Sequence, residues 1–333
     1  MFVELLLAVT LSSALLVFLA PDELAPRLAT ALSLLPLAIV AVMWTAFDAG
    51  GNALTAGGTV AFETQAAWFD LGRYSLQWHV GVDGVSFPLL ALTVVLTTLS
   101  MVSAWTPIDE RQSQFYGLLF LLEAALVGVF TALDVVLWLV CWEFVLIPMY
   151  FLIAIWGGPR RKYAAIKFLV YTNLASLVMF AGVFVLVLGL DSSLTTLSMP
   201  DISQAVHAGR IEALAFDLPI SDGAVAFDPE AVKLGAFALL FVGFAVKVPL
   251  VPFHTWLPDA HVEAPTPVSV LLAGVLLKMG TYALLRFNFT MLPDVAADHA
   301  EIIAVVGVVS VIYGAMLALA QRDLKRIVAY SSI

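Results

Sequence analysis

The chain has 333 residues, of which 62% are hydrophobic and only 12% are charged, and its mean hydropathy is +1.01. A soluble globular chain is about 45–50% apolar and about 25% charged. This composition therefore excludes a soluble globular protein and predicts an all-α polytopic membrane protein. The net charge of −10 argues against nucleic acid as a partner. The single cysteine, Cys141, excludes an internal disulfide and a cysteine-ligated zinc or iron–sulfur site within the chain.

Nine segments are long and apolar enough to cross a bilayer as helices, which takes about 20 residues. In chain order they are 2–20, 28–47, 85–105, 115–132, 135–156, 164–190, 234–256, 265–287 and 301–320. The first segment has no basic residues before it, so we interpret it as a retained span rather than a cleaved signal peptide. Little more than Asp134 separates the fourth and fifth segments, which predicts a tight antiparallel pair.

Two long connections, 48–84 and 191–233, are too polar to lie in lipid, and the second contains a candidate surface helix around 202–215. Basic residues favour the inside of a membrane, and they gather in alternate connections of this chain. With the N-terminus outside, the inside connections carry Arg27, Arg111, Arg160, Arg161, Lys162, Arg322, Lys325 and Arg326. The outside connections carry few basic residues and most of the acids. We therefore expect a cell-membrane protein with an outside N-terminus and cytoplasmic basic loops.

Four ionisable residues fall near the middle of four different spans: Glu123, Glu143, Lys247 and Lys278. An isolated charge at that depth costs at least about 2.5–3.5 kcal/mol, so we expect the four side chains to face the bundle interior and to interact there. A static salt-bridge network is one interpretation, although such pairs add little net stability. A proton-handling chain is the interpretation that we favour.

Two further cations, Lys167 and Arg286, lie near the ends of their spans. Their long side chains can extend along the helix to the headgroups, so we expect no role for them in the bundle interior.

Two prolines, Pro249 and Pro252, follow Lys247 in the stretch FAVKVPLVPFHTW. Each removes a backbone donor and clashes with the preceding turn, which predicts a helix break just after Lys247. Broken helices persist at membrane depth where the freed backbone lines protein or a hydrated cavity. Glu143, on a helix that carries Pro148, is the natural opposing charge for the lysine.

Two histidines follow the predicted break, His254 and, in LPDAHVEA beside Asp259 and Glu263, His261. A lone histidine is more often structural, but together with Lys278 these two could carry protons between the inner surface and the midplane. Their spacing does not match a zinc site, and the chain has no phosphate loop, nucleophile triad or haem motif. We therefore expect no cofactor and no metal in this chain.

Long stretches of the sequence resemble a known family. Residues 244–287, FAVKVPLVPFHTWLPDAHVEAPTPVSVLLAGVLLKMGTYALLRF, look like the signature of the antiporter-like subunits of respiratory complex I and of Mrp-type antiporters. Residues 142–172, WEFVLIPMYFLIAIWGGPRRKYAAIKFLVYT, resemble the M-type (chain 4) subunit specifically. The stretches GVDGVSFPLL, residues 81–90, and RDLKRIVAYSSI, residues 322–333, fit as well, so the resemblance covers most of the chain from about residue 80.

The resemblance implies a proton-translocating subunit of the enzyme NADH:quinone oxidoreductase, with other membrane-arm subunits and the lipid bilayer as partners. Iron–sulfur clusters, flavin and quinone would then reside in partner subunits. The family's functional glutamates and lysines fall on Glu123, Glu143, Lys247 and Lys278, the same four residues that the depth argument selects.

The resemblance also implies a domain organisation. Family members have about 14 helices, with two inverted repeats of five helices each. We expect an N-terminal three-helix segment at 1–113, a complete proton-translocation repeat with a discontinuous seventh helix at 114–290, and the start of a second repeat at 291–333. The missing helices would come from a separate chain, or the sequence is incomplete.

Two other functions remain open from the sequence. An Mrp-type Na⁺/H⁺ antiporter subunit would use the same charged spans, and a structural membrane scaffold would not need them.

Overall fold

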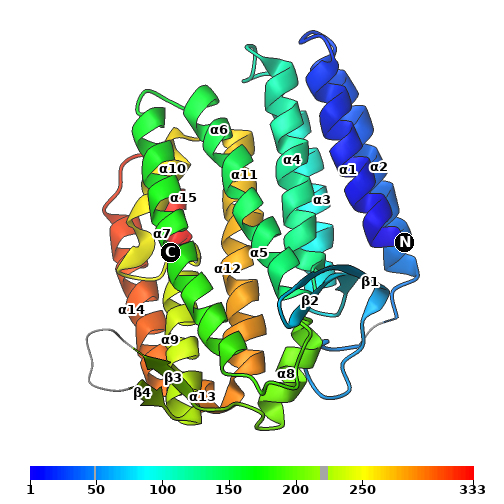
Figure 1. Ribbon diagram of the computed structural model, residues 1–333. Coiled ribbons are helices and arrows are strands. Elements are labelled where there is room, and N and C mark those ends of the chain that lie inside the picture. Colours follow the sequence, from blue (N-terminus) through cyan, green and yellow to red (C-terminus); the bar gives the residue numbers. More distant parts are fainter. Residues whose placement is uncertain (49, 218–223) are drawn as a thin grey trace.

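The computed structural model describes residues 1–48, 50–217 and 224–333. In this part of the chain, nine helices are long and apolar enough to cross a membrane, and they stand side by side in one bundle (Figure 1). Their bounds lie within a few residues of the predicted ones, except where the seventh is broken. The prediction of an all-α polytopic membrane protein is therefore confirmed.

The first six spans are continuous helices apart from one short interruption. They are α1 (Phe2–Leu19), α2 (Ala25–Thr45), α3 (Ser86–Ser103), α4 (Gln112–Thr131), α5 with α6 (Val135–Phe144 and Leu146–Trp156) and α7 (Arg161–Leu188). The last three are α9 (Pro229–Lys247), α11 with α12 (Thr266–Leu271 and Leu277–Ala283) and α14 (Ala300–Leu319). Two π-helical stretches, Leu272–Leu276 and Leu284–Met291, complete the α11–α12 span.

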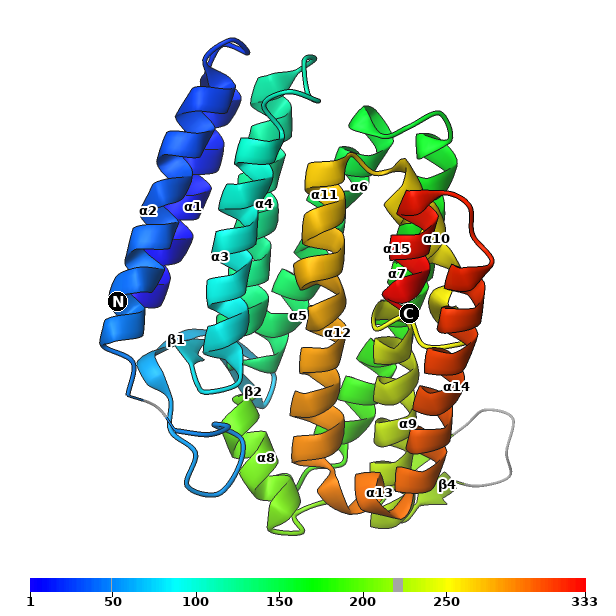
Figure 2. The ribbon, with the colours of Figure 1, turned by 180° about the vertical axis from the view of Figure 1, so that it is seen from behind.

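The two ends of the bundle carry different structural elements (Figures 1 and 2), and the connections at each end differ in charge. We call one the acidic end; it carries strands β1 (Ala61–Leu71), β2 (Tyr74–Val82), β3 (Leu214–Asp217) and β4 (Ala224–Phe227), and helices α8 (Met199–His207) and α13 (Pro293–Asp298). The opposite, basic end carries the connections α1–α2, α3–α4 and α6–α7, and the turn before α15 (Leu324–Ser331). The acidic and basic connections, which alternate along the sequence, thus lie at opposite ends of the bundle.

The 48–84 connection contains an antiparallel hairpin that the sequence analysis did not predict. Strands β1 and β2 pair from Ala61 with Val82 to Leu71 with Tyr74, and Gly72 has a φ of 62° in the turn. A left-handed residue at this point favours glycine because a Cβ would be strained there.

The predicted surface helix around 202–215 is correct only in its first half. Helix α8 ends at His207, and Gly209 follows with a φ of 71°, as is common just after a helix end. Residues 214–217 pair instead with β4 as a strand.

The predicted tight pair of the fourth and fifth spans is confirmed. The carboxylate of Asp134 accepts hydrogen bonds from the backbone N–H groups of Val136 (2.9 Å) and Leu137 (3.2 Å), so it caps the first turn of α5. Close packing continues along the pair, because a Cβ placed on Gly128 of α4 would lie 2.5 Å from Sγ of Cys141.

Helices α7 and α9 pack against each other through two glycines. A Cβ on Gly182 would lie 2.9 Å from the backbone nitrogen of Leu240. A Cβ on Gly243 would lie 2.7 Å from Cβ of Met179 and 3.0 Å from the carbonyl oxygen of Ala175. Small residues at such contacts let helix backbones approach closely, so α9 is fixed along α7.

Candidate functional site

The seventh span is broken where the prolines predict it. Helix α9 ends at Lys247, and the chain continues through a 3-10 turn at Phe253–Thr255 into α10 (Trp256–Glu263). We call α9 the long half of the broken helix, and residues 253–263 the short half. Because the predicted 234–256 span includes the break, its helix is shorter at this end than the hydropathy pattern indicates.

Backbone groups released by the break find partners on other elements. The carbonyl oxygen of Val246 accepts a hydrogen bond from Nε1 of Trp256 (2.8 Å). The backbone N–H of Val251 donates to Oγ of Ser310 on α14 (3.0 Å). An unsatisfied backbone group costs several kcal/mol in a membrane, so these two side chains stabilise the break.

Lys247, at the end of the long half, is 2% exposed, and its ammonium has no hydrogen-bond partner among the described residues. The Nζ atom lies 5.2 Å from the ring centroid of Trp142. The carboxylate of Glu143, the next residue along α5, is the charge that acts on this ammonium. Glu143 is half-buried, and its Oε1 also lacks a hydrogen-bond partner in the described structure.

Helix α12 approaches the break at Gly280. A Cβ on this residue would lie 2.8 Å from Cγ2 of Val248 and 3.1 Å from Cβ of Lys247. The glycine therefore lets α12 pack directly against the end of the long half.

The contacts of Lys247 are poorly suited to a purely structural role. A static ion pair would bring nitrogen and oxygen within 4 Å with additional hydrogen bonds, and Lys247 and Glu143 form no such pair in the described structure. The interaction with the face of Trp142 contributes about 0.5–2 kcal/mol, which is less than the cost of at least about 2.5–3.5 kcal/mol for a charge at this depth. Stability alone does not account for the lysine, so a functional role is the better explanation.

Aromatic side chains close the acidic-end side of Lys247. Trp138 lies 4.8 Å from Trp142 and 4.9 Å from Phe287, and Phe244 lies 5.7 Å from Trp142, measured between ring centroids. All four are buried and lie toward the acidic end along their helices. This aromatic wall is mostly apolar, with the buried Nε1 of Trp138 as an unpartnered donor in the described structure, so it restricts access of water to the lysine from that end.

The basic-end side of Lys247 is polar. His254 and His261 in the short half are 6% and 4% exposed, and His254 Nδ1 and His261 Nε2 have no hydrogen-bond partner in the described structure. His261 also lines a hollow of about 430 Å³ together with Ser269 and Lys325. The predicted histidines therefore stand between the lysine and the basic end of the bundle.

Ion pairs surround the short half at the basic end. Nζ of Lys167 lies 2.7 Å from Oδ2 of Asp259, and Arg160 reaches the same carboxylate at 3.3 Å. The carboxylate of Glu263 accepts a hydrogen bond from the backbone N–H of Arg160 (2.8 Å). The expectation that Lys167 extends to the headgroups is thus wrong, because Asp259 provides a partner from another helix.

The other two predicted midplane residues differ from each other. Glu123 on α4 is 1% exposed, and both of its carboxylate oxygens lack a hydrogen-bond partner among the described residues. Lys278 on α12 is exposed, whereas its neighbours Leu277 and Met279 are buried. The expectation that all four charges face the interior is therefore wrong for Lys278, which points away from the packed side of α12.

The structure also contains a buried charged pair that the sequence analysis missed. The guanidinium of Arg286 donates to both carboxylate oxygens of Asp83 at 2.6 and 2.7 Å, and both side chains are 1% exposed. Burial by itself would raise the pKa of Asp83, but the hydrogen bonds and charge of Arg286 outweigh burial and lower it. Arg286 does not reach the headgroups as expected. It joins the end of the α11–α12 span to the start of α3.

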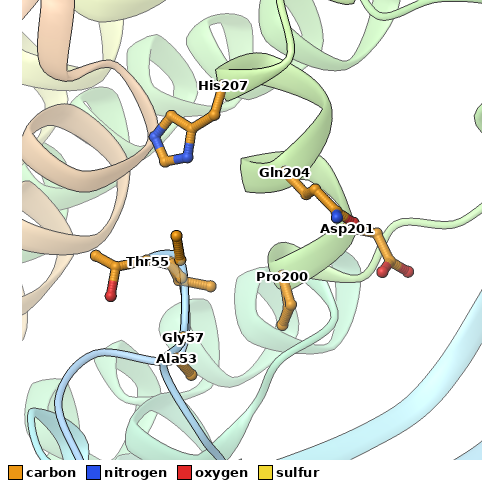
Figure 3. Close-up of a pocket in the computed structure, with 9 residues that line it drawn as sticks. Ala53, Thr55, Gly57, Pro200, Asp201, Gln204 and His207 are labelled. Carbon is orange, nitrogen blue, oxygen red and sulfur yellow. The ribbon is translucent and has the colours of Figure 1, made fainter.

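A separate hollow of about 310 Å³ lies at the acidic end, between residues 53–57 and helix α8 (Figure 3). Figure 3 shows the carboxylate of Asp201 pointing away from the loop, and His207 is already bonded to the carbonyl oxygen of Thr290 at 2.8 Å. Few polar groups converge on this hollow, and the described residues contain no cluster of three or more histidine, cysteine or acidic ligands for a metal. The candidate site is therefore the charged interior around Lys247.

A polytopic bundle with a discontinuous helix and ionisable side chains at mid-depth is typical of proteins that move ions across membranes. The chain belongs to the NADH:quinone oxidoreductase/Mrp antiporter transmembrane family, which it matches over residues 132–333. The predicted family is thus confirmed.

Individual relatives are named as chains of NAD(P)H-quinone oxidoreductase. The chain is 41% identical over 304 residues to NAD(P)H-quinone oxidoreductase chain 4 3 of Trichormus variabilis. The alignment covers 89% of this chain and 49% of the relative. It is 45% identical over 261 residues to chain 4 2 of Microcystis aeruginosa, covering 78% of this chain and 43% of the relative. The chain spans about half the length of the curated relatives it matches.

Solved structures share the fold. A chain of respiratory complex I from Thermus thermophilus with bound NADH is similar with a TM-score of 0.78 and 26% identity, over 100% of this chain and 62% of that one. A chain of the archaeal membrane-bound sulfane sulfur reductase has the same fold with a TM-score of 0.75 at 22% identity, over 99% of this chain and 62% of that one. Both are chains of respiratory membrane complexes.

Proposed function

We propose that this chain is a proton-translocating membrane-arm subunit of a complex I-type enzyme that oxidises NADH or another donor and reduces quinone. The observation that carries the proposal is Lys247: a buried, unpaired ammonium at a helix break, with Glu143 as its charged neighbour. Relatives named as chains of NAD(P)H-quinone oxidoreductase support the assignment to such an enzyme.

The separation of Glu143 and Lys247 would control the proton. At an effective dielectric constant of about 20, two unit charges about 5 Å apart attract each other by about 3 kcal/mol, and at about 8 Å by about 2 kcal/mol. Approach of the carboxylate thus favours the protonated lysine, and its withdrawal favours release. A displacement of a few ångströms changes the proton affinity by close to tenfold.

The polar short half of the broken helix suggests the direction from which protons arrive. His261 lies by the hollow near the basic end, and His254 lies between it and the break, so both can relay protons toward Lys247. The aromatic wall disfavours exit straight to the acidic end, so the proton would leave sideways. Glu123 and Lys278 are our candidates for the neighbouring steps.

A partner for Lys278 would have to come from outside the half of the relatives' length that this chain covers. Its exposed position on α12 suits contact with further helices, which in the relatives would belong to the remaining half of the protein. We propose that residues 114–290 form one translocation unit and that α14 and α15 begin a second. We assign the iron–sulfur clusters, flavin and quinone to partner subunits.

The protein's orientation also remains a proposal. We place it in the cell membrane with the acidic end outside. The N-terminal ammonium donates to Oγ1 of Thr64 on the hairpin (3.1 Å), so the N-terminus lies at that end.

Moving one charge across 100 mV takes about 2.3 kcal/mol, which redox chemistry in the partner subunits must supply. The test replaces Glu143→Gln or Lys247→Ala in the assembled complex and measures quinone reduction with proton uptake into vesicles. We expect a loss of at least about tenfold in both, with unchanged electron transfer to an artificial acceptor. Lys233→Ala on the same helix, which removes a lysine bonded to Glu230 near the acidic end, is the matched control. Normal proton movement in the Lys247 variant would refute the proposal.

The family description also names Mrp antiporters, which gives a second candidate function. An Mrp-type subunit would exchange Na⁺ for protons without quinone reduction. Measuring proton movement driven by a Na⁺ gradient, in the absence of an electron donor, separates the two.

A further inference from the structure

Helix α14 contacts the rest of the described structure at a restricted place. Only Ser310 and Gly314 of its residues are buried, and the remainder of the helix is largely exposed. In Figure 2 it stands at the edge of the bundle beside α9. A helix with so few buried residues gains little from packing, so the contacts that it does make are informative.

Ser310 is placed at the break itself. Its Oγ accepts the hydrogen bond from the backbone N–H of Val251 at 3.0 Å and donates to the carbonyl oxygen of Val306 at 2.9 Å. In a continuous helix, the N–H of Val251 would donate to the carbonyl oxygen four residues earlier, which belongs to Lys247. The serine therefore takes the place of the Lys247 carbonyl and keeps the break open.

Two further contacts extend this attachment along the short half. The ring of Tyr313 on α14 lies 5.3 Å from the ring of His254. Just after the end of α10, Nζ of Lys325 on α15 donates a hydrogen bond to the carbonyl oxygen of Ala264 at 2.8 Å. Helices α14 and α15 thus contact the chain just before the short half, at its first turn and just after its end.

We propose that Ser310 is a positioning residue for Lys247, and that α14 transmits movement of the neighbouring helices to the broken helix through it. The proposal rests on the proposed proton translocation. Without the hydroxyl, the backbone N–H of Val251 loses its acceptor. The backbone at the break would then be held less firmly, and the lysine would move relative to Glu143.

The experiment compares Ser310→Ala, Ser310→Thr and a matched control in the assembled complex. The control is Ser33→Ala on α2, which removes a buried hydroxyl that donates to its own helix at the carbonyl of Thr30 (2.9 Å). We expect Ser310→Ala to lower proton uptake per quinone reduced by roughly three- to tenfold and to displace the pH profile of turnover. Ser310→Thr, which keeps the hydroxyl, should restore both.

A second measurement does not depend on the function. Hydrogen–deuterium exchange of the peptide around residues 248–256 should be faster in Ser310→Ala than in the wild-type protein or in Ser33→Ala. Unchanged exchange, or a pumping ratio and pH profile equal to those of Ser33→Ala, would overturn the inference. If Lys247→Ala also pumps normally, the proposed function fails; if only Ser310→Ala does, this inference alone fails.

Discussion

The buried pair of Asp83 and Arg286 makes a quantitative prediction about stability. Asp83 accepts two hydrogen bonds from the guanidinium and one each from the backbone N–H groups of Ala53 (2.6 Å) and Ser86 (2.9 Å). In Asp83→Ala the guanidinium stays buried without its counter-charge. Breaking a buried pair in this way costs about 3–5 kcal/mol, a large part of a total stability of about 5–15 kcal/mol.

The double variant Asp83→Ala/Arg286→Leu separates the charge from the packing. Because it removes both charges together, it should be less destabilised than the sum of the two single variants, with a coupling energy of about 0.5–3 kcal/mol. The matched control is Asp191→Ala, which breaks a solvent-screened pair with Arg210 and should be far less destabilising.

The assay is thermal unfolding of the detergent-purified protein, followed by the fraction that remains monodisperse after heating. We expect Asp83→Ala to lower the midpoint by on the order of 5–10 °C, and Asp191→Ala by about 2 °C or less. The reasoning is refuted if Asp83→Ala unfolds at the wild-type temperature, or if the double variant loses the full sum of the single effects.

Two other predictions follow from the same structure. The pKa of Asp83 is lowered in the folded protein, so its contribution to stability is present above the usual carboxyl pKa of about 4 and is lost as the pH falls through the lowered value. The difference in unfolding midpoint between wild type and Asp83→Asn should therefore shrink in acid. A constant difference down to about pH 2 would contradict this. Gly280→Ala should cost about 1–3 kcal/mol because its Cβ would lie 2.9 Å from the backbone nitrogen of Val248, whereas Gly235→Ala on α9, which meets nothing within 4 Å, should be neutral or stabilising in the same thermal assay.

The helix break and the spans could be predicted because their causes are local. About 20 apolar residues are needed to cross a bilayer, and a proline removes a particular backbone donor, so both are encoded within a short stretch of sequence. The depth of Glu143 and Lys247 follows from the same counting.

The orientation of side chains around the helices could not be predicted in the same way. A span that is apolar on every side gives no hydrophobic face, so the exposure of Lys278 was not readable from the sequence. The pairing of Arg286 with Asp83 joins residues 203 positions apart. The hairpin at 61–82 did have a local signal, a glycine turn between two stretches of mixed aromatic and polar residues, which hydropathy averaging obscured.

The glycine contacts between α7 and α9 give the two halves of the broken helix unequal stiffness. The backbones of α7 and α9 approach closely at Gly182 and Gly243, so the two helices cannot slide along each other without steric overlap. The long half is therefore held in a fixed position. The chain after Lys247 also has single polar contacts, from Val251 to Ser310 and from Asp259 to Lys167, which can be exchanged one at a time. A rearrangement at Lys247 would therefore move the short half relative to the anchored α9. It would exchange these polar contacts and also shift the buried packing of Trp256 and Leu257.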